Sequence, residues 1–257
     1  QLYLYDLKEN SYSLLDTIAP EFYLSGNGDY GLSPTRGGWN LYHFPSGTKK
    51  LIEGKELGSP WFTTDNQGVT FEGAGAVWYY EIKTATLTPL VTFKEYQTSI
   101  ANGQWEGFVT GKSAFAKQQV NLSEPLVICL YDAETNKTGY CLWSNGKTEV
   151  IIPPTTKRIR SLNYNRSFTR FSWLEEDYYL PPRLVYKDLG KQSEKETERV
   201  VYQSNKQDTA ILFQKQEIVR YTNSDSIPLK GILYYPLGNT KSDRKSTRLN
   251  SSHITIS

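Results

Sequence analysis

Few residues between Gln1 and Ser242 could carry out covalent chemistry. The only histidine in this range is His43, in the alternating segment NLYHF. The range contains no Gly-x-Ser-x-Gly pentapeptide, the turn that presents the nucleophilic serine of an α/β-hydrolase. No second metal ligand accompanies His43. We therefore expect His43 to be an ordinary, partly buried strand residue, and we assign no catalytic, cofactor-binding or metal-binding residue.

One glycine-containing segment, GFVTGKS at residues 107–113, has some features of a phosphate-binding loop. That motif needs four residues between its glycines, and this segment has three. No helical pattern follows Ser113, so no helix N-terminus would be available to bind a phosphate. The segment therefore predicts a strand and a turn.

Two cysteines, Cys129 and Cys141, flank the turn-like segment DAETNKTG. If residues 127–131 pair with residues 139–143, the two side chains face each other on one face of a hairpin. This register allows either two small buried thiols or a cross-strand disulfide. We favour free thiols, because a directly opposed pair strains the disulfide dihedral. Their spacing fits no zinc-ligand pattern.

The composition indicates a β-rich globular protein, with 14% aromatic residues and frequent Gly and Pro. The formal net charge is +2, but three basic residues and one acidic residue lie in the last fifteen positions, which leaves 26 of each sign. This balance argues against a nucleic-acid partner. No window approaches eighteen consecutive apolar residues, so we expect no membrane segment. The chain lacks an initiating Met and a signal-peptide pattern, and the compartment stays open, with periplasmic and secreted locations both allowed.

The chain is organised as a repeat of short hairpins. Alternating strand pairs start at Gln1, Trp39, Val77, Tyr140 and Arg183, with a spacing of about 38 residues at first and about 43 at the end, close to the period of a propeller blade. Further strand-like sequence precedes the hairpins, as at 59–75 and 160–181. The middle step is longer, because Tyr96–Pro125 inserts polar sequence. The pattern predicts about five four-stranded blades, the first incomplete.

A different hairpin follows the repeats at Glu217–Gly238, EIVRYTNSDSIPLKGILYYPLG. Two alternating strands flank the turn-forming residues 223–226. The segment resembles the start of the catalytic domain in prolyl oligopeptidase and dipeptidyl peptidase family serine peptidases, which reads YTNSDG-(I/V)PLKG-x-LYYP-x-G. Ser226 stands where that family more often has Gly.

This resemblance implies a partial β-propeller followed by the first strands of an α/β-hydrolase domain. The implied activity is peptide hydrolysis by a Ser, His and Asp triad, with the propeller restricting substrate entry. The triad residues would lie beyond this hairpin, so we expect this chain to be inactive alone. The alternative is a non-enzymatic propeller that binds other proteins.

Dipeptidyl members of the same family also use a propeller glutamate pair to hold the substrate's α-amino group. Glu175 and Glu176, followed by Asp177, could suggest that role, but their sequence context differs from the family's pair. We expect them to form a solvated acidic turn.

The last fifteen residues, 243–257, read DRKSTRLNSSHITIS and resemble a translated sequencing adapter. We therefore expect three parts: a partial propeller over 1–216, the beginning of a hydrolase domain over 217–242, and a non-native tail over 243–257.

Overall fold

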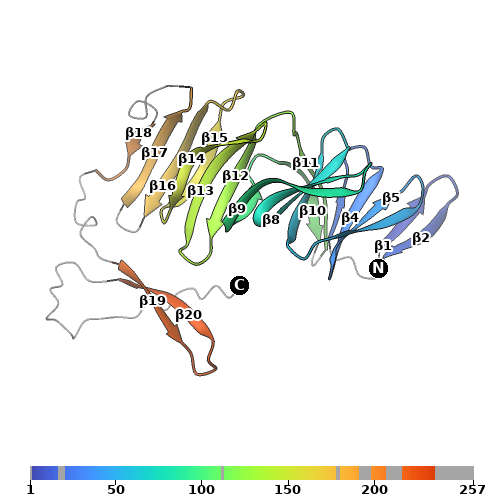
Figure 1. Cartoon of the computed structure of the whole chain (residues 1–257), viewed down its shortest axis with the longest axis horizontal. Helices are drawn as coiled ribbons and strands as arrows, with labels where there is room; N and C mark the ends of the chain where they lie inside the picture. Colours follow the sequence, from blue (N-terminus) through green and yellow to red (C-terminus); the bar gives the residue numbers. More distant parts are fainter. Residues whose placement is uncertain are drawn as a thin grey trace. The chain divides into compact units, whose positions relative to one another are not determined.

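A computed structural model describes residues 2–16, 21–110, 113–177, 180–190, 198–206 and 216–234. Every regular element in these ranges is a β-strand (Figure 1). The all-β fold class is therefore confirmed. The chain divides into two compact units, Gln1–Thr156 and Lys157–Ser257. Within the described ranges, no helix has the length and apolarity that a membrane crossing requires.

The first unit starts with a hairpin and an antiparallel meander. The hairpin consists of β1 (Leu2–Asp6) and β2 (Ser11–Asp16). The meander consists of β3 (Glu21–Leu24), β4 (Tyr30–Thr35), β5 (Gly38–His43) and β6 (Thr48–Glu53). Burial falls across this meander: β5 buries four of its six residues, whereas β6 buries only Ile52. Four antiparallel strands with an exposed outer strand match a propeller blade.

The next strands depart from the expected blade pattern. The strand β8 (Gly68–Glu81) pairs with β7 (Leu57–Thr63) in its first half and with β9 (Thr86–Ile100) in its second. A register shift lies between Ala74 and Ala76, where Gly75 has a φ of 77°. Such a bulge bends a strand without reversing it. The two strand pairs that the sequence predicts here therefore share one long strand.

The polar segment Tyr96–Pro125 also joins the sheet rather than forming a separate insertion. It supplies the hairpin of β10 (Gln104–Thr110) and β11 (Ser113–Val120). The strand β11 runs parallel to both β3 and β7, so that it connects the meander to the following strands.

The remaining strands of the first unit extend the same sheet. The strand β9 pairs with β12 (Leu126–Asp132), and β13 (Lys137–Ser144) and β14 (Lys147–Thr155) follow in antiparallel order. The result is one twelve-stranded sheet, where the sequence predicts separate four-stranded blades. Its two cores contain fully buried Leu32, Phe62 and Phe71 in one and Leu126 and Ile128 in the other. Burial of each such side chain contributes about 1.5–3 kcal/mol.

The second unit contains one four-stranded blade and one separate hairpin. The blade is the meander β15 (Arg158–Tyr164), β16 (Arg170–Asp177), β17 (Leu180–Asp188) and β18 (Glu198–Gln203). The hairpin consists of β19 (Gln216–Thr222) and β20 (Pro228–Tyr234), and forms its own sheet. The sequence predicted the strands of this last blade, and it also predicted the final hairpin.

Candidate functional site

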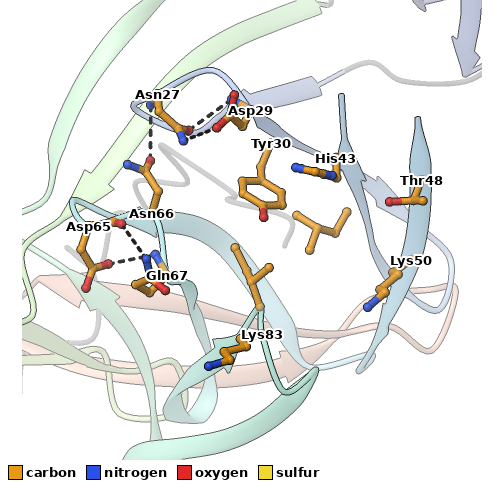
Figure 2. A pocket seen from close by; sticks show the side chains of 12 residues that line it. Asn27, Asp29, Tyr30, His43, Thr48, Lys50, Asp65, Asn66, Gln67 and Lys83 are labelled. Carbon is orange, nitrogen blue, oxygen red and sulfur yellow. Dashed lines mark hydrogen bonds between the residues drawn. The ribbon is translucent and has the colours of Figure 1, made fainter. Parts of the chain in front are cut away.

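The first unit has a pocket of about 500 Å³ where two turns and two hairpin ends meet (Figure 2). Its lining is mostly polar, with two carboxylates, three amides, two lysines and one histidine. The lining residues are Asn27, Asp29, Tyr30, Leu41, His43, Thr48, Lys50, Asp65, Asn66, Gln67, Ile82 and Lys83.

The turn between β3 and β4 supplies one wall of this pocket. Ser25 closes the turn, because its Oγ accepts a hydrogen bond from the Tyr30 backbone N–H at 3.0 Å and donates one to Asn27 Oδ1 at 2.7 Å. Asn27 Oδ1 also accepts from the Asp29 backbone N–H at 3.1 Å, and Asn27 Nδ2 donates to Asp29 Oδ2 at 2.6 Å. Gly28 has a φ of 78°, the left-handed conformation that glycine adopts without cost. These bonds hold Asn27 and Asp29 in fixed positions at the rim.

The turn between β7 and β8 repeats this arrangement. Thr63 Oγ1 accepts from the Gly68 backbone N–H at 3.0 Å and donates to Asp65 Oδ1. Asp65 Oδ1 accepts from the Gln67 backbone N–H at 3.0 Å, and Asn66 takes the left-handed position, with a φ of 57°. Asn66 Oδ1 accepts the Asn27 backbone N–H at 3.3 Å, so the two turns are joined directly.

The sequence carries a signal for these paired turns that differs from any catalytic motif. Ser25 and Thr63 are about 38 residues apart, the period of the hairpin repeat. Each is followed by an Asx residue two positions later, a combination that caps turns through side-chain to backbone hydrogen bonds.

The floor of the pocket is formed by rings and aliphatic side chains. The rings of Tyr30 and His43 lie with their centroids 4.7 Å apart. Leu41 is buried and Ile82 is partly buried. His43 lies at the end of β5, as predicted, and its Nδ1 is 2.6 Å from Ser46 Oγ. The structure adds that His43 lines a pocket, which its strand pattern alone did not indicate.

Two lysines complete the lining from the hairpin side. Lys50 lies on β6, and Lys83 follows β8 in the turn to β9; both are exposed. Neither ammonium group forms an ion pair with another residue in the part of the chain that the structure describes. Within the described residues, both ammonium groups are therefore available to a negatively charged group of a ligand.

The expectation for Glu175, Glu176 and Asp177 was wrong, because these residues belong to strand β16 and not to a solvated turn. Glu175 is only 4% exposed. Its Oε1 accepts hydrogen bonds from Lys157 Nζ at 2.9 Å and Arg183 Nε at 2.6 Å, and its Oε2 from Trp173 Nε1 at 3.4 Å. A buried carboxylate needs such partners to remain charged. The Glu175 carboxylate is therefore the centre of an ion cluster with Lys157 and Arg183.

The pKa of Glu175 reflects two opposing effects. Burial raises it, but the hydrogen bonds and positive charges of Lys157 and Arg183 outweigh burial and bring the pKa below its ordinary value. The neighbouring Glu176 pairs at 3.3 Å with Arg158 and at 2.8 Å with Arg160, both of which are exposed. The two glutamates thus differ in burial although they are adjacent in sequence.

The predicted register of Cys129 and Cys141 was wrong by one residue. Cys129 lies opposite Tyr140, and Cys141 lies opposite Ile128. Because a one-residue shift exchanges the faces of a strand, the two thiols point to opposite faces of the hairpin. Both cysteines are free, as favoured from the sequence. Burial raises the pKa of Cys129 and raises that of Cys141 to about 12.

The segment at 107–113 behaves as predicted in its described residues. Residues 107–110 end β10, Ser113 begins β11, and Thr110 pairs with Ser113; residues 111 and 112, where the turn was predicted, lie outside the described residues. Among the described side chains, no three His, Cys, Asp or Glu residues gather closely enough to hold a metal ion. The predicted tail, 243–257, lies outside the described residues.

The strands define an all-β protein with propeller-type antiparallel blades. Dipeptidyl peptidase 4 from Porphyromonas gingivalis is similar to 93% of the chain, with a TM-score of 0.56 and 12% identity, over 35% of its own length. Apo prolyl oligopeptidase B from Galerina marginata is similar to 85% of the chain, with a TM-score of 0.37 and 10% identity, over 38% of its length. Oligogalacturonate lyase from Vibrio parahaemolyticus matches 93% of the chain, with a TM-score of 0.45 and 13% identity, over 67% of its length.

The similarity to dipeptidyl peptidase 4 confirms, at the level of the fold, the resemblance seen in the sequence. The chain spans little more than a third of each of the two peptidases. No protein-family model and no curated protein matches the sequence.

Proposed function

We propose that this chain is the non-catalytic propeller part of a prolyl oligopeptidase-like serine peptidase, together with the beginning of its hydrolase domain. The observation that carries this proposal is the hairpin β19–β20. It follows the four-stranded blade β15–β18, forms a sheet of its own, and contains the segment YTNSDSIPLKG that resembles the peptidase family.

The turn of this hairpin gives a physical reason for the family pattern. Ser226 has a φ of 63°, the left-handed conformation, which costs an L-residue about 1–2 kcal/mol and costs glycine little. The family's preference for Gly at this position fits that conformation, because glycine adopts it at little cost. Asn223 Oδ1 accepts the backbone N–H groups of Asp225 at 3.0 Å and Ile227 at 2.9 Å, and these bonds hold the turn with Ser226 in place.

In the intact peptidase, a Ser would attack the scissile carbonyl, a His would take its proton and an Asp would orient the His. We propose that all three triad residues follow residue 242 and that residues 1–216 restrict the access of peptides to them. Residues 217–242 would form the beginning of the catalytic domain. Residues 243–257 would be adapter-derived. This chain alone would then have no peptidase activity.

Recovery of an overlapping genomic sequence tests the proposal directly. The reading frame should continue past Ser242 into a continuous apolar strand, then a Gly-x-Ser-x-Gly pentapeptide, then Asp and His in that order. An independent clone that ends in the same fifteen residues and a stop codon would refute it and favour the protein-binding propeller.

Assay of the purified 257-residue chain provides a second test. Chromogenic peptides containing proline or alanine should not be hydrolysed above a blank. Turnover that an active-site serine reagent abolishes would show that a nucleophile lies within this chain, and would overturn the assignment of residues 1–242.

A further inference from the structure

The pocket in the first unit presents opposite charges on different sides. Figure 2 places Asn27, Asp29, Asp65 and Asn66 along one side, and Thr48 and Lys50 along another, with Lys83 at the lower edge. The turns that carry the carboxylates are fixed by their own hydrogen bonds and by the bond between Asn66 and Asn27. The charged groups of the acidic side are therefore held in place before any ligand binds.

Each carboxylate keeps one oxygen available to a ligand. Asp29 uses Oδ2 to accept from Asn27, and Asp65 uses Oδ1 to accept from Thr63 and Gln67. Their other oxygens, Asp29 Oδ1 and Asp65 Oδ2, make no hydrogen bond to another residue in the described part of the chain. These oxygens can accept hydrogen bonds from an ammonium group.

The two lysines, which Figure 2 places at the right and at the lower edge, have the complementary capacity. The ammonium groups of Lys50 and Lys83 have no carboxylate partner among the described residues and can bind a carboxylate. Between the two sides, the Tyr30 ring, Leu41 and Ile82 form an apolar floor. A volume of about 500 Å³ lies within the range typical of small-molecule sites.

We propose that this pocket binds a short peptide in its zwitterionic form, with its α-ammonium group at Asp29 and Asp65 and its terminal carboxylate at Lys50 and Lys83. An apolar side chain of the peptide packs on Tyr30, Leu41 and Ile82. The pocket thus forms a peptide site on the propeller itself. It requires no catalytic residue, so it does not depend on the proposed peptidase function.

The arrangement also explains why the ligand needs both charges. A simple anion would be attracted to the lysines but repelled by the two carboxylates. A simple cation would be attracted to the carboxylates but repelled by the lysines. A zwitterion of suitable length satisfies both sides, and its attraction weakens with added salt because the pocket is open to solvent.

The test is a ligand-observed NMR titration of the full 257-residue chain with the dipeptide Ala-Phe at low ionic strength. Binding should be saturable, and acetylation of the amino end or amidation of the carboxyl end should each weaken it by about 3–10-fold. Lys50→Gln and Lys83→Gln should each weaken the free dipeptide by a similar factor. Neither variant should weaken binding of the amidated dipeptide, which lacks the carboxylate that the lysines attract.

The matched control is Lys147→Gln, at an exposed lysine that begins β14 and does not line the pocket. It should leave the dissociation constant unchanged. The proposal is overturned if Ala-Phe does not bind at 10 mM, a concentration that would detect even weak binding of about −2.7 kcal/mol. It is also overturned if the doubly blocked dipeptide binds equally well, or if Lys147→Gln weakens binding as much as the pocket variants. Each of these results leaves the peptidase assignment to be decided by the genomic sequence.

Discussion

Replacing Glu175 with Gln should destabilise the second unit far more than the same change at its neighbour Glu176. Glu175→Gln keeps the shape of the side chain but removes the charge that binds Lys157 and Arg183. Removing one partner of a fully buried ion pair costs about 3–5 kcal/mol. Here the side chains of Lys157 and Arg183 are 33% and 23% exposed, so water compensates in part. We expect a loss of about 2 kcal/mol at pH 7.

The adjacent Glu176→Gln is the matched control. Its partners Arg158 and Arg160 are 71% and 43% exposed, so solvent screens both ion pairs. Exposed pairs of this kind contribute about 0–1 kcal/mol, and we expect a loss of about 0.5 kcal/mol. The two variants remove the same charge from the same strand, so that burial is the main difference between them.

The pH dependence follows from the lowered pKa of Glu175. A carboxyl group with a depressed pKa in the folded state stabilises the fold fully above its unfolded pKa of about 4.3. This contribution is lost as the pH falls through the lower folded value. The difference between the wild-type protein and Glu175→Gln should therefore be largest at neutral pH and shrink below about pH 4.

Urea denaturation of the wild-type protein and both variants, followed by far-UV circular dichroism and Trp fluorescence at pH 7 and pH 3.5, measures these differences. Trp173 donates a hydrogen bond to Glu175, so its fluorescence reports on the cluster. Equal losses in the two variants at pH 7, or an unchanged loss for Glu175→Gln at pH 3.5, would refute the reasoning.

Two further predictions concern the turns and the thiols. Ala85 has a φ of 55°, so Ala85→Gly should stabilise the first unit by about 0.5–1 kcal/mol. The control Ala133→Gly lies in the corresponding turn before Lys137 but has no positive φ, so it should destabilise the unit. Urea midpoints that move in the opposite directions would contradict this prediction. Because burial raises the pKa of both thiols, Cys129 and Cys141 should react slowly with a thiol reagent in the native protein at pH 7 and rapidly in denaturant, and fast native reaction of Cys141 would show that the thiol is not buried.

The hairpins of this protein could be predicted from the sequence because they depend on local properties. Alternating side chains specify strands, and residues able to adopt a positive φ end the loops between them. Asn10 and Gly47 hold this position in the first two hairpins, 37 residues apart, and the final hairpin closes on Ser226 in the same conformation. Local chemistry was sufficient for each of these turns.

Other features depend on interactions that a single segment does not determine. Whether residues 68–81 form one strand or two depends on the partners β7 and β9 on either side. The face of the hairpin on which Cys129 and Cys141 each lie depends on the strand register, because a shift of one residue moves a side chain to the other face.

By itself, the sequence of this protein determined an all-β repeat ending in a peptidase-like hairpin, because strand alternation and turn residues act over a few positions. The tertiary structure decided which polar groups meet. Glu175 became a buried ion centre because Lys157 and Arg183 approach from β15 and β17 or their flanks. The pocket formed because two turns a full repeat apart are held together by Asn66 and Asn27, and such contacts depend on packing between distant segments.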